Sequence, residues 1–147
     1  LSQKISHFGF SLFILSILIN GVFAKEFSSN MKVGDERKFL NKIIKFENLK
    51  IIEKNNYKSL VANFIISDNK GTINLRPEVR IYNQPITLTS EADIRSTILS
   101  DNFLVFNVIN NDGYYNVRYQ FKPLMIWIWF SIILISVGGI LGLFKKI

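Results

Sequence analysis

The sequence offers few side chains that could do chemistry, and its single histidine, His7, is the first to consider. His7 lies in residues 5–24, a run that carries no formal charge when the imidazole is neutral. Ionisable or ligating groups inside an apolar helix are costly to bury and tend to be functional. A neutral imidazole there is a suitable axial ligand for haem iron, although a six-coordinate haem would need a second ligand that this chain lacks. The alternative is a histidine at the helix end, in the headgroup region, with no special role.

Composition excludes most other kinds of catalytic site. One histidine and no cysteine leave no His-rich metal site, no thiolate ligand and no cysteine nucleophile. The middle of the chain contains no histidine, so no nucleophile–histidine–acid group can form there. Glu91 and Asp93 could act as a carboxylate pair, but neighbouring acids of this kind usually serve capping and solubility, and no glycine-rich phosphate loop follows a strand. The chain is a poor candidate for a self-contained enzyme, and we predict no catalytic residue in it.

Two long apolar runs predict two transmembrane helices. Residues 5–24 and 123–144 would extend over about 30 Å and 33 Å as helices, which matches a bilayer core of about 30 Å. Lys4, Lys145 and Lys146 favour cytoplasmic ends by the positive-inside rule, so the middle segment would lie in the periplasm or its mitochondrial equivalent. We thus predict a transmembrane helix in 1–24, a periplasmic β domain in 25–121, and a second transmembrane helix with a short cytoplasmic tail in 122–147.

The first apolar run has a second interpretation, as a cleaved signal peptide. A lysine, an apolar stretch and the small residue Ala24 before Lys25 are typical of secretory signals. His7 and Asn20 are unusual in a simple signal sequence, and the start at Leu1 suggests a piece of a longer chain. We favour a retained helix. The alternative is a signal-peptide-bearing, single-pass membrane-anchored β domain that binds or senses rather than catalyses.

The middle segment predicts a small, mainly antiparallel β domain of the sandwich or barrel type. Strands are indicated by β-branched and aromatic content or by alternation of apolar and polar residues in 42–52, 57–67, 72–82, 103–109 and 114–121. Residues 68–71 and 110–113 have the composition of hairpin turns. Pro77 implies an edge position or a bulge, and residues 90–99 are expected to form a short helix or an ordered loop.

The net charge of +7 does not indicate a nucleic-acid-binding protein. Basic residues are spread among acidic ones, and no lysine or arginine run faces a row of base-stacking aromatics. The charge therefore predicts a solvated surface.

The second apolar run carries features of anchoring and packing. Trp127 and Trp129 stand near its start and are typical of an aromatic belt at the membrane interface. Gly138, Gly139 and Gly142 would allow close contact with a helical neighbour, either the first helix or a part of the protein outside this sequence.

Several stretches together resemble the CcmF family, the haem-lyase subunits of bacterial and mitochondrial cytochrome c maturation. The resemblance lies in His7 with Gly9, and in residues 31–35 (MKVGD), 56–57 (NY), 75–82 (LRPEVRIY), 89–94 (TSEADI), 117–123 (VRYQFKP), 127–129 (WIW) and 138–139 (GG). Their order and spacing hold across nearly the whole chain. Val33, Val79 and Ser90 depart from the family's pattern, which has proline, a basic residue and threonine there.

The resemblance implies a part in haem attachment. The family passes haem from a periplasmic carrier to the Cys-x-x-Cys-His site of apocytochrome c, and it holds a haem b between two transmembrane histidines, of which His7 matches one. The family's tryptophan-rich haem-handling motif, its periplasmic haem-binding histidines and its other haem b ligand lie upstream of this segment. The expected partners are therefore the remainder of the haem lyase, other maturation subunits, the haem carrier and apocytochrome c. The expected location is the bacterial inner membrane or its mitochondrial equivalent.

Three arginines of the middle segment could contact partners. Arg76, Arg80 and Arg118 are placed to reach haem propionates or a partner's carboxylates, because arginine pairs well with both. The alternative is that they are ordinary solvent-facing strand residues. Our hypothesis is that the β domain is a docking surface for the haem carrier or the apocytochrome.

Overall fold

A computed structural model describes residues 1–109 and 113–144, which form two helices and ten strands. In chain order the elements are α1 (Ser2–Phe23), β1 (Lys25–Met31), β2 (Glu36–Phe39), β3 (Lys42–Glu53), β4 (Tyr57–Asp68), β5 (Gly71–Leu75), β6 (Glu78–Asn83), β7 (Ile86–Glu91), β8 (Asp93–Ser96), β9 (Ser100–Val108), β10 (Tyr115–Pro123) and α2 (Met125–Phe144). The chain divides into two compact units. The helical unit contains residues 1–25, 96–101 and those from 121 on, and the β unit contains residues 26–95 and 102–120.

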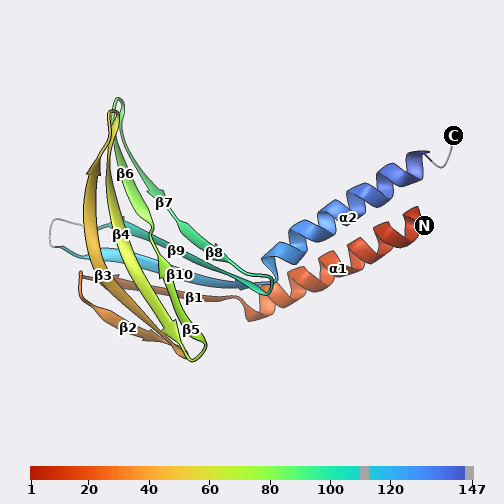
Figure 1. The fold of residues 1–147 in the computed structure, drawn as a ribbon, viewed down its shortest axis with the longest axis horizontal. Helices are drawn as coiled ribbons and strands as arrows, with labels where there is room; N and C mark the ends of the chain where they lie inside the picture. Colours follow the sequence, from red (N-terminus) through yellow and green to blue (C-terminus); the bar gives the residue numbers. More distant parts are fainter. Residues whose placement is uncertain (110–112, 145–147) are drawn as a thin grey trace. The chain divides into compact units, whose positions relative to one another are not determined.

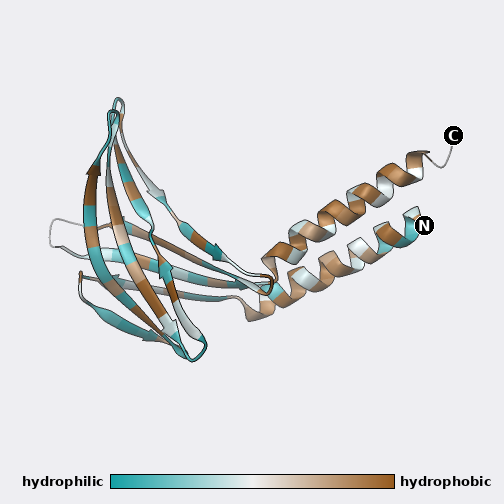
Figure 2. Ribbon diagram, viewed as in Figure 1, coloured by the Kyte–Doolittle hydropathy of each residue, from teal (hydrophilic) through white to brown (hydrophobic). Residues whose placement is uncertain are grey.

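Helices α1 and α2 are long and apolar enough to cross a membrane, with 22 and 20 residues. Most of their side chains are exposed, unlike those of a helix in the core of a soluble protein. Figure 2 shows apolar residues around most of both helices, whereas apolar and polar residues alternate along many strands. The prediction of two apolar helices that flank a mainly antiparallel β domain is confirmed.

The two helices form an antiparallel pair and lie side by side (Figure 1). Near the end of α1, the Asn20 side-chain amide donates to the carbonyl of Pro123, just before α2, at 2.6 Å. At the other end, a Cβ added to Gly138 would lie 2.7 Å from the backbone nitrogen of Ser6 and 3.0 Å from the carbonyl oxygen of Ser2. Only a residue without a side chain fits at such a distance, so Gly138 permits the two backbones to approach.

The β unit is a sandwich of two sheets (Figure 1). One sheet has the strand order β1-β10-β9-β8, and the other has the order β2-β3-β4-β6-β7, with β5 also paired to β4. All the described pairings of the larger sheet are antiparallel. Antiparallel strands of this kind can bury one face and leave the other in water, which accounts for the alternation in the sequence.

Aromatic side chains from both sheets meet in the core. Phe46 and Phe64 of the larger sheet stack with ring centroids 4.4 Å apart, and both contact Phe106 of the smaller sheet at 6.5 and 6.3 Å. Tyr115 packs edge-on against Phe46 at 5.6 Å. Each such pair contributes about 0.5–1.5 kcal/mol beyond its buried area, so this cluster stabilises the contact between the sheets.

A polar cluster also joins the two sheets. Lys42 of β3 donates to Asn102 of β9 at 3.1 Å and to the hydroxyl of Tyr119 of β10 at 2.9 Å, while that hydroxyl donates to Asn102 at 2.5 Å. Burial lowers the pKa of Lys42 and raises the pKa of Tyr119, because both charged forms lose solvation. The hydrogen bonds offset part of that loss.

Pro77 divides the strand predicted over residues 72–82. The chain forms β5 and β6 instead, and both pair with β4, at residues 64–68 and 57–61 respectively. The sequence predicts an edge position or a bulge at Pro77. The structure instead shows a break between two strands that keep one register against β4, because proline cannot donate to a ladder. The hairpin predicted at residues 68–71 is confirmed, since the Asp68 carboxylate accepts from the backbone nitrogens of Lys70 and Gly71. The predicted turn at 110–113 falls largely on residues 110–112, outside the described residues.

The short helix or loop predicted for residues 90–99 is wrong. This region contains the end of β7, all of β8 and the turn before β9. β7 is held by its ladder with β6, in which Glu91 lies opposite Glu78. Pairing between strands overrides the weak local signal of a helix cap. Two strands that the sequence did not reveal also form by pairing, β1 with the distant strand β10 and β2 with the neighbouring strand β3.

Replacing Gly138 with alanine should weaken the helix pair. The new Cβ would press on backbone atoms of Ser2 and Ser6, and overpacking of this kind costs about 1–3 kcal/mol. We expect a lower thermal unfolding temperature of the purified chain in detergent. Gly139→Ala is the matched control, because its Cβ would meet nothing within 4 Å. Equal unfolding temperatures for the two variants would contradict the close approach.

Replacing Tyr119 with phenylalanine should destabilise the β unit. The change removes the hydroxyl from a buried polar cluster, which costs about 1–3 kcal/mol. Because the pKa of Tyr119 is raised in the folded chain, the unfolded chain loses the phenolic proton first, at a pH of about 10. The free energy of unfolding should therefore fall as the pH rises above that value.

Denaturant titrations of the chain in detergent at a series of alkaline pH values measure this fall. It should be smaller in Tyr119→Phe than in the wild type. Tyr114→Phe, which changes a half-exposed tyrosine, should retain the wild-type slope. The same slope in all three proteins would show that Tyr119 is not buried as described.

Candidate functional site

His7 lies on the side of α1 that α2 leaves uncovered. Ser6 contacts α2 at Gly138, and Gly9 contacts it at Ile135, where an added Cβ would lie 3.0 Å from the backbone nitrogen. His7 is exposed, and Ser11, one turn further along α1, is exposed as well. The hydroxyl of Ser11 donates to the main-chain oxygen of His7 at 3.0 Å. The packing of the pair thus turns the imidazole outward.

The imidazole of His7 is available to a ligand. Ser11 bonds the main chain of His7 and not its ring. Neither ring nitrogen of His7 has a hydrogen-bond partner among the described residues. Residues 1–109 and 113–144 contain no group of three or more His, Cys, Asp or Glu side chains that could hold a metal ion. Phe8 and Phe10 beside His7 are exposed and apolar. An imidazole on an apolar helix surface fits one axial position of a haem, with the second ligand supplied from outside this chain.

Asn20, the other unusual residue of the first apolar run, has a structural role. Its side-chain amide donates to the carbonyl of Pro123. Inside a membrane an unpaired amide would cost several kcal/mol, so this bond both satisfies Asn20 and holds the end of α1 against the start of α2.

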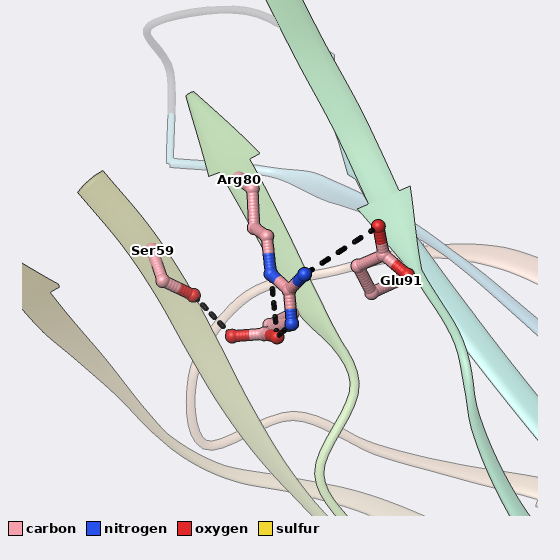
Figure 3. Close-up of polar contacts among 4 residues, drawn as sticks. Ser59, Arg80 and Glu91 are labelled. Carbon is pink, nitrogen blue, oxygen red and sulfur yellow. Dashed lines mark hydrogen bonds and ion pairs between the residues drawn. The ribbon is translucent and has the colours of Figure 1, made fainter. Parts of the chain in front are cut away.

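Arg80 lies in a charged cluster with Glu78 and Glu91 (Figure 3). The cluster is on the outer face of the larger sheet, because the neighbouring Val79 is fully buried in the core. Its guanidinium bonds Glu78, at 2.8 Å through Nε and also through Nη2, and lies 3.9 Å from Glu91. Ser59 of β4 donates to the other oxygen of Glu78. Burial opposes the charge on Glu78, but the bonds from Ser59 and Arg80 hold its pKa below the usual value. Arg80 also lies 5.3 Å from the ring of Tyr57, so its donors and its face are already engaged.

Arg118 is also paired within the chain. Its guanidinium forms two contacts with the Glu26 carboxylate, at 2.7 and 3.0 Å, and Gln120 donates to the same carboxylate at 2.7 Å. Arg118 points outward from the smaller sheet, because its neighbours Val117 and Tyr119 are fully buried in the core. Glu26 thus links β1 to β10.

The three arginines do not converge on one site. Arg80 and Arg118 belong to different sheets and point away from the core. Arg76 lies between β5 and β6, is exposed, and uses its backbone nitrogen to bond Asp93 at 2.6 Å. A role of these arginines in contacting a partner or propionates stays a prediction.

Trp127 makes a contact that the sequence did not reveal. Its indole nitrogen donates to the carbonyl of Ile98, in the turn between β8 and β9, at 2.9 Å. Trp129 is 62% exposed. The two tryptophans therefore differ: Trp127 ties a turn to α2, and Trp129 is free to act as the interfacial anchor predicted for both.

Comparison with known proteins gives a consistent result. A family model described as the CcmF C-terminal beta-sandwich matches residues 22–123. The chain is 27% identical over 141 residues to the cytochrome c-type biogenesis protein CcmF of Pseudomonas aeruginosa, and 28% identical over 140 residues to that of Escherichia coli. Each match covers 95% of this chain and 22% of the relative. The chain thus spans about a fifth of the length of these curated relatives.

A solved structure described as cytochrome c heme lyase CcmF has a similar fold. It aligns with a TM-score of 0.69 at 17% sequence identity. The match covers 95% of this chain and 23% of that chain. At this identity the likeness supports the arrangement of helices and strands alone.

Loss of Arg80 should destabilise the β unit more than loss of Arg118. Arg80→Ala would leave Glu78 without its charged partner and close to Glu91, whereas Arg118→Ala removes a more exposed ion pair that contributes little. We expect a lower denaturant midpoint for Arg80→Ala, measured by circular dichroism at the wavelength of the β-sheet signal in detergent. A larger loss in Arg118→Ala would mean that the cluster around Glu78 is not a stabilising unit.

Proposed function

The chain belongs to the CcmF family, and from this premise we propose that it is the C-terminal part of a cytochrome c biogenesis haem lyase. In this role it takes part in the transfer of haem to apocytochrome c. The family match over the whole sandwich supports this function. Because the sequence predicts no catalytic residue, we propose that the chemistry of attachment depends on other parts of the lyase.

The two apolar helices and the family together indicate an inner-membrane protein. We propose that both helix ends near Lys4 and Lys145 face the cytoplasm and that the β sandwich lies in the periplasm. The positive-inside rule supports this orientation. The close packing of α1 against α2 at Gly9 also supports a retained helix rather than a cleaved signal peptide.

His7 is our candidate for one axial ligand of a transmembrane haem b. The observation that carries this proposal is the position of the imidazole, which is exposed on the uncovered side of α1 with both nitrogens uncommitted. A bound haem supplies a redox-active iron. His7 would bind and orient that group, and the apolar side chains beside it would keep water away from its edge.

The sandwich is proposed as a docking surface for the haem carrier or the apocytochrome. Arg76 is the best placed of the three arginines for this role, because it is exposed and its only described bond uses the backbone. Arg80 and Arg118 would have to release Glu78 or Glu26 before they could bind a carboxylate of a partner.

Replacing His7 with alanine should remove a haem b signal. The chain is purified in detergent after co-expression with the segment of the lyase that completes it, and reduced-minus-oxidised optical spectra are recorded. We expect the signal in the wild type and its loss in His7→Ala, because the iron loses an axial ligand.

Ser11→Ala is the matched control, since it changes a polar residue one turn away that contacts only the backbone of His7. It should keep the haem signal. An unchanged haem signal in His7→Ala, with the complex intact, would show that His7 is not an axial ligand.

A further inference from the structure

The turn between β8 and β9 has an unusual composition. Its outer residues, Thr97 and Ser100, bond each other: the Thr97 nitrogen and hydroxyl both donate to the carbonyl of Ser100, and the Ser100 nitrogen donates to the Thr97 hydroxyl. Its central residues are Ile98 and Leu99, which are 68% and 69% exposed. Turns are normally built from Gly, Pro, Asn, Asp and Ser, so two large apolar side chains at the apex are not explained by turn formation.

The backbone of this turn is bonded to the start of α2. The carbonyl of Ile98 accepts from the indole nitrogen of Trp127, and the carbonyl of Leu99 accepts from the backbone nitrogen of Leu124, each at 2.9 Å. The two carbonyls at the apex are therefore satisfied within the protein, while their side chains point away from it. A segment with satisfied backbone groups and exposed apolar side chains suits a surface where water is scarce.

The turn lies next to the first residues of α2, where the apolar helix begins. Trp129 is 62% exposed and Ile126 is 46% exposed, both in the first turns of α2. Tryptophan is enriched where membrane helices cross the headgroup region, so this end of α2 would mark the interface. The turn is joined directly to it through Trp127.

We propose that Ile98 and Leu99 insert into the boundary between lipid headgroups and acyl chains beside the start of α2. The turn would then act as a second interfacial anchor, at a depth of about 5–10 Å. The occupant of this surface is lipid, because the exposed apolar turn continues the lipid-facing surface of α2. The inference goes beyond the proposed function and rests only on its premise that α2 crosses the bilayer.

The absence of cysteine from this sequence allows a single introduced cysteine to be labelled in the purified chain before it is combined with other segments. Ile98→Cys and Leu99→Cys are labelled with a bimane fluorophore in the full chain, which is then combined with its companion segment and reconstituted into vesicles of phosphatidylcholine and phosphatidylglycerol. One vesicle preparation contains lipid with a nitroxide near the headgroup, and a second contains lipid with a nitroxide deep in the acyl region. Ile86→Cys, at the start of β7 and 87% exposed, is the control for an apolar residue in water, and Ile133→Cys within α2 reports on the span itself.

We expect lipid nitroxide to quench bimane at positions 98 and 99 several times more strongly than at position 86. Strong reaction of Ile98→Cys and Leu99→Cys with a membrane-impermeant thiol reagent would overturn the proposal, because the turn would lie in water. Protection from both the reagent and the nitroxide would overturn it as well, because another protein segment would then cover the turn. Lack of quenching at position 133 by nitroxide placed deep in the acyl region would show that α2 does not span the bilayer, and the premise of the proposed function would fail with the inference.

Discussion

The close approach of α1 and α2 at Gly138 is the constraint on which the helical unit depends. Without a side chain at that position, Ser6 of α1 lies directly on the backbone of α2, and Gly9 makes a similar contact one turn further on. In lipid, apolar surface alone does not drive helices together, so close packing of small residues and satisfied polar groups must do so. This contact fixes which side of α1 faces α2, and therefore turns His7 outward, where a ligand could reach it.

Two residues of the stretch 31–35, which resembles a family motif, have structural roles in the β unit. Gly34 adopts a φ of 94°, a conformation that favours glycine, and its nitrogen donates to Phe46 at 2.7 Å. The Asp35 carboxylate accepts from the backbone nitrogen of Lys32 at 3.0 Å. These bonds shape the connection between β1 and β2 and tie it to β3. Residues that resemble a family motif can thus be required for the fold of the β unit.

Features that depend on local composition could be predicted from the sequence. The two helices followed from charge-free runs, and the hairpin at 68–71 followed from Asp68 and Gly71. Features that depend on distant partners could not. Strand β1 forms because it pairs with β10, and Arg118 is committed to Glu26, which lies 92 residues away in the sequence. The outward position of His7 likewise depends on which residues of α1 meet α2.

Disulfide formation between residues 2 and 142 tests the pairing of α1 and α2 most directly. A Cβ at Gly142 would lie 4.0 Å from the Cβ of Ser2, within the range of about 3.5–4.5 Å found across disulfides. In native membranes, the Ser2→Cys/Gly142→Cys protein should form an intramolecular disulfide under mild oxidation, detected by a shift in electrophoretic mobility. Ser2→Cys/Gly139→Cys should not, because a Cβ at Gly139 meets nothing within 4 Å. Equal cross-linking of both variants, or of neither, would contradict the antiparallel pair that turns His7 outward.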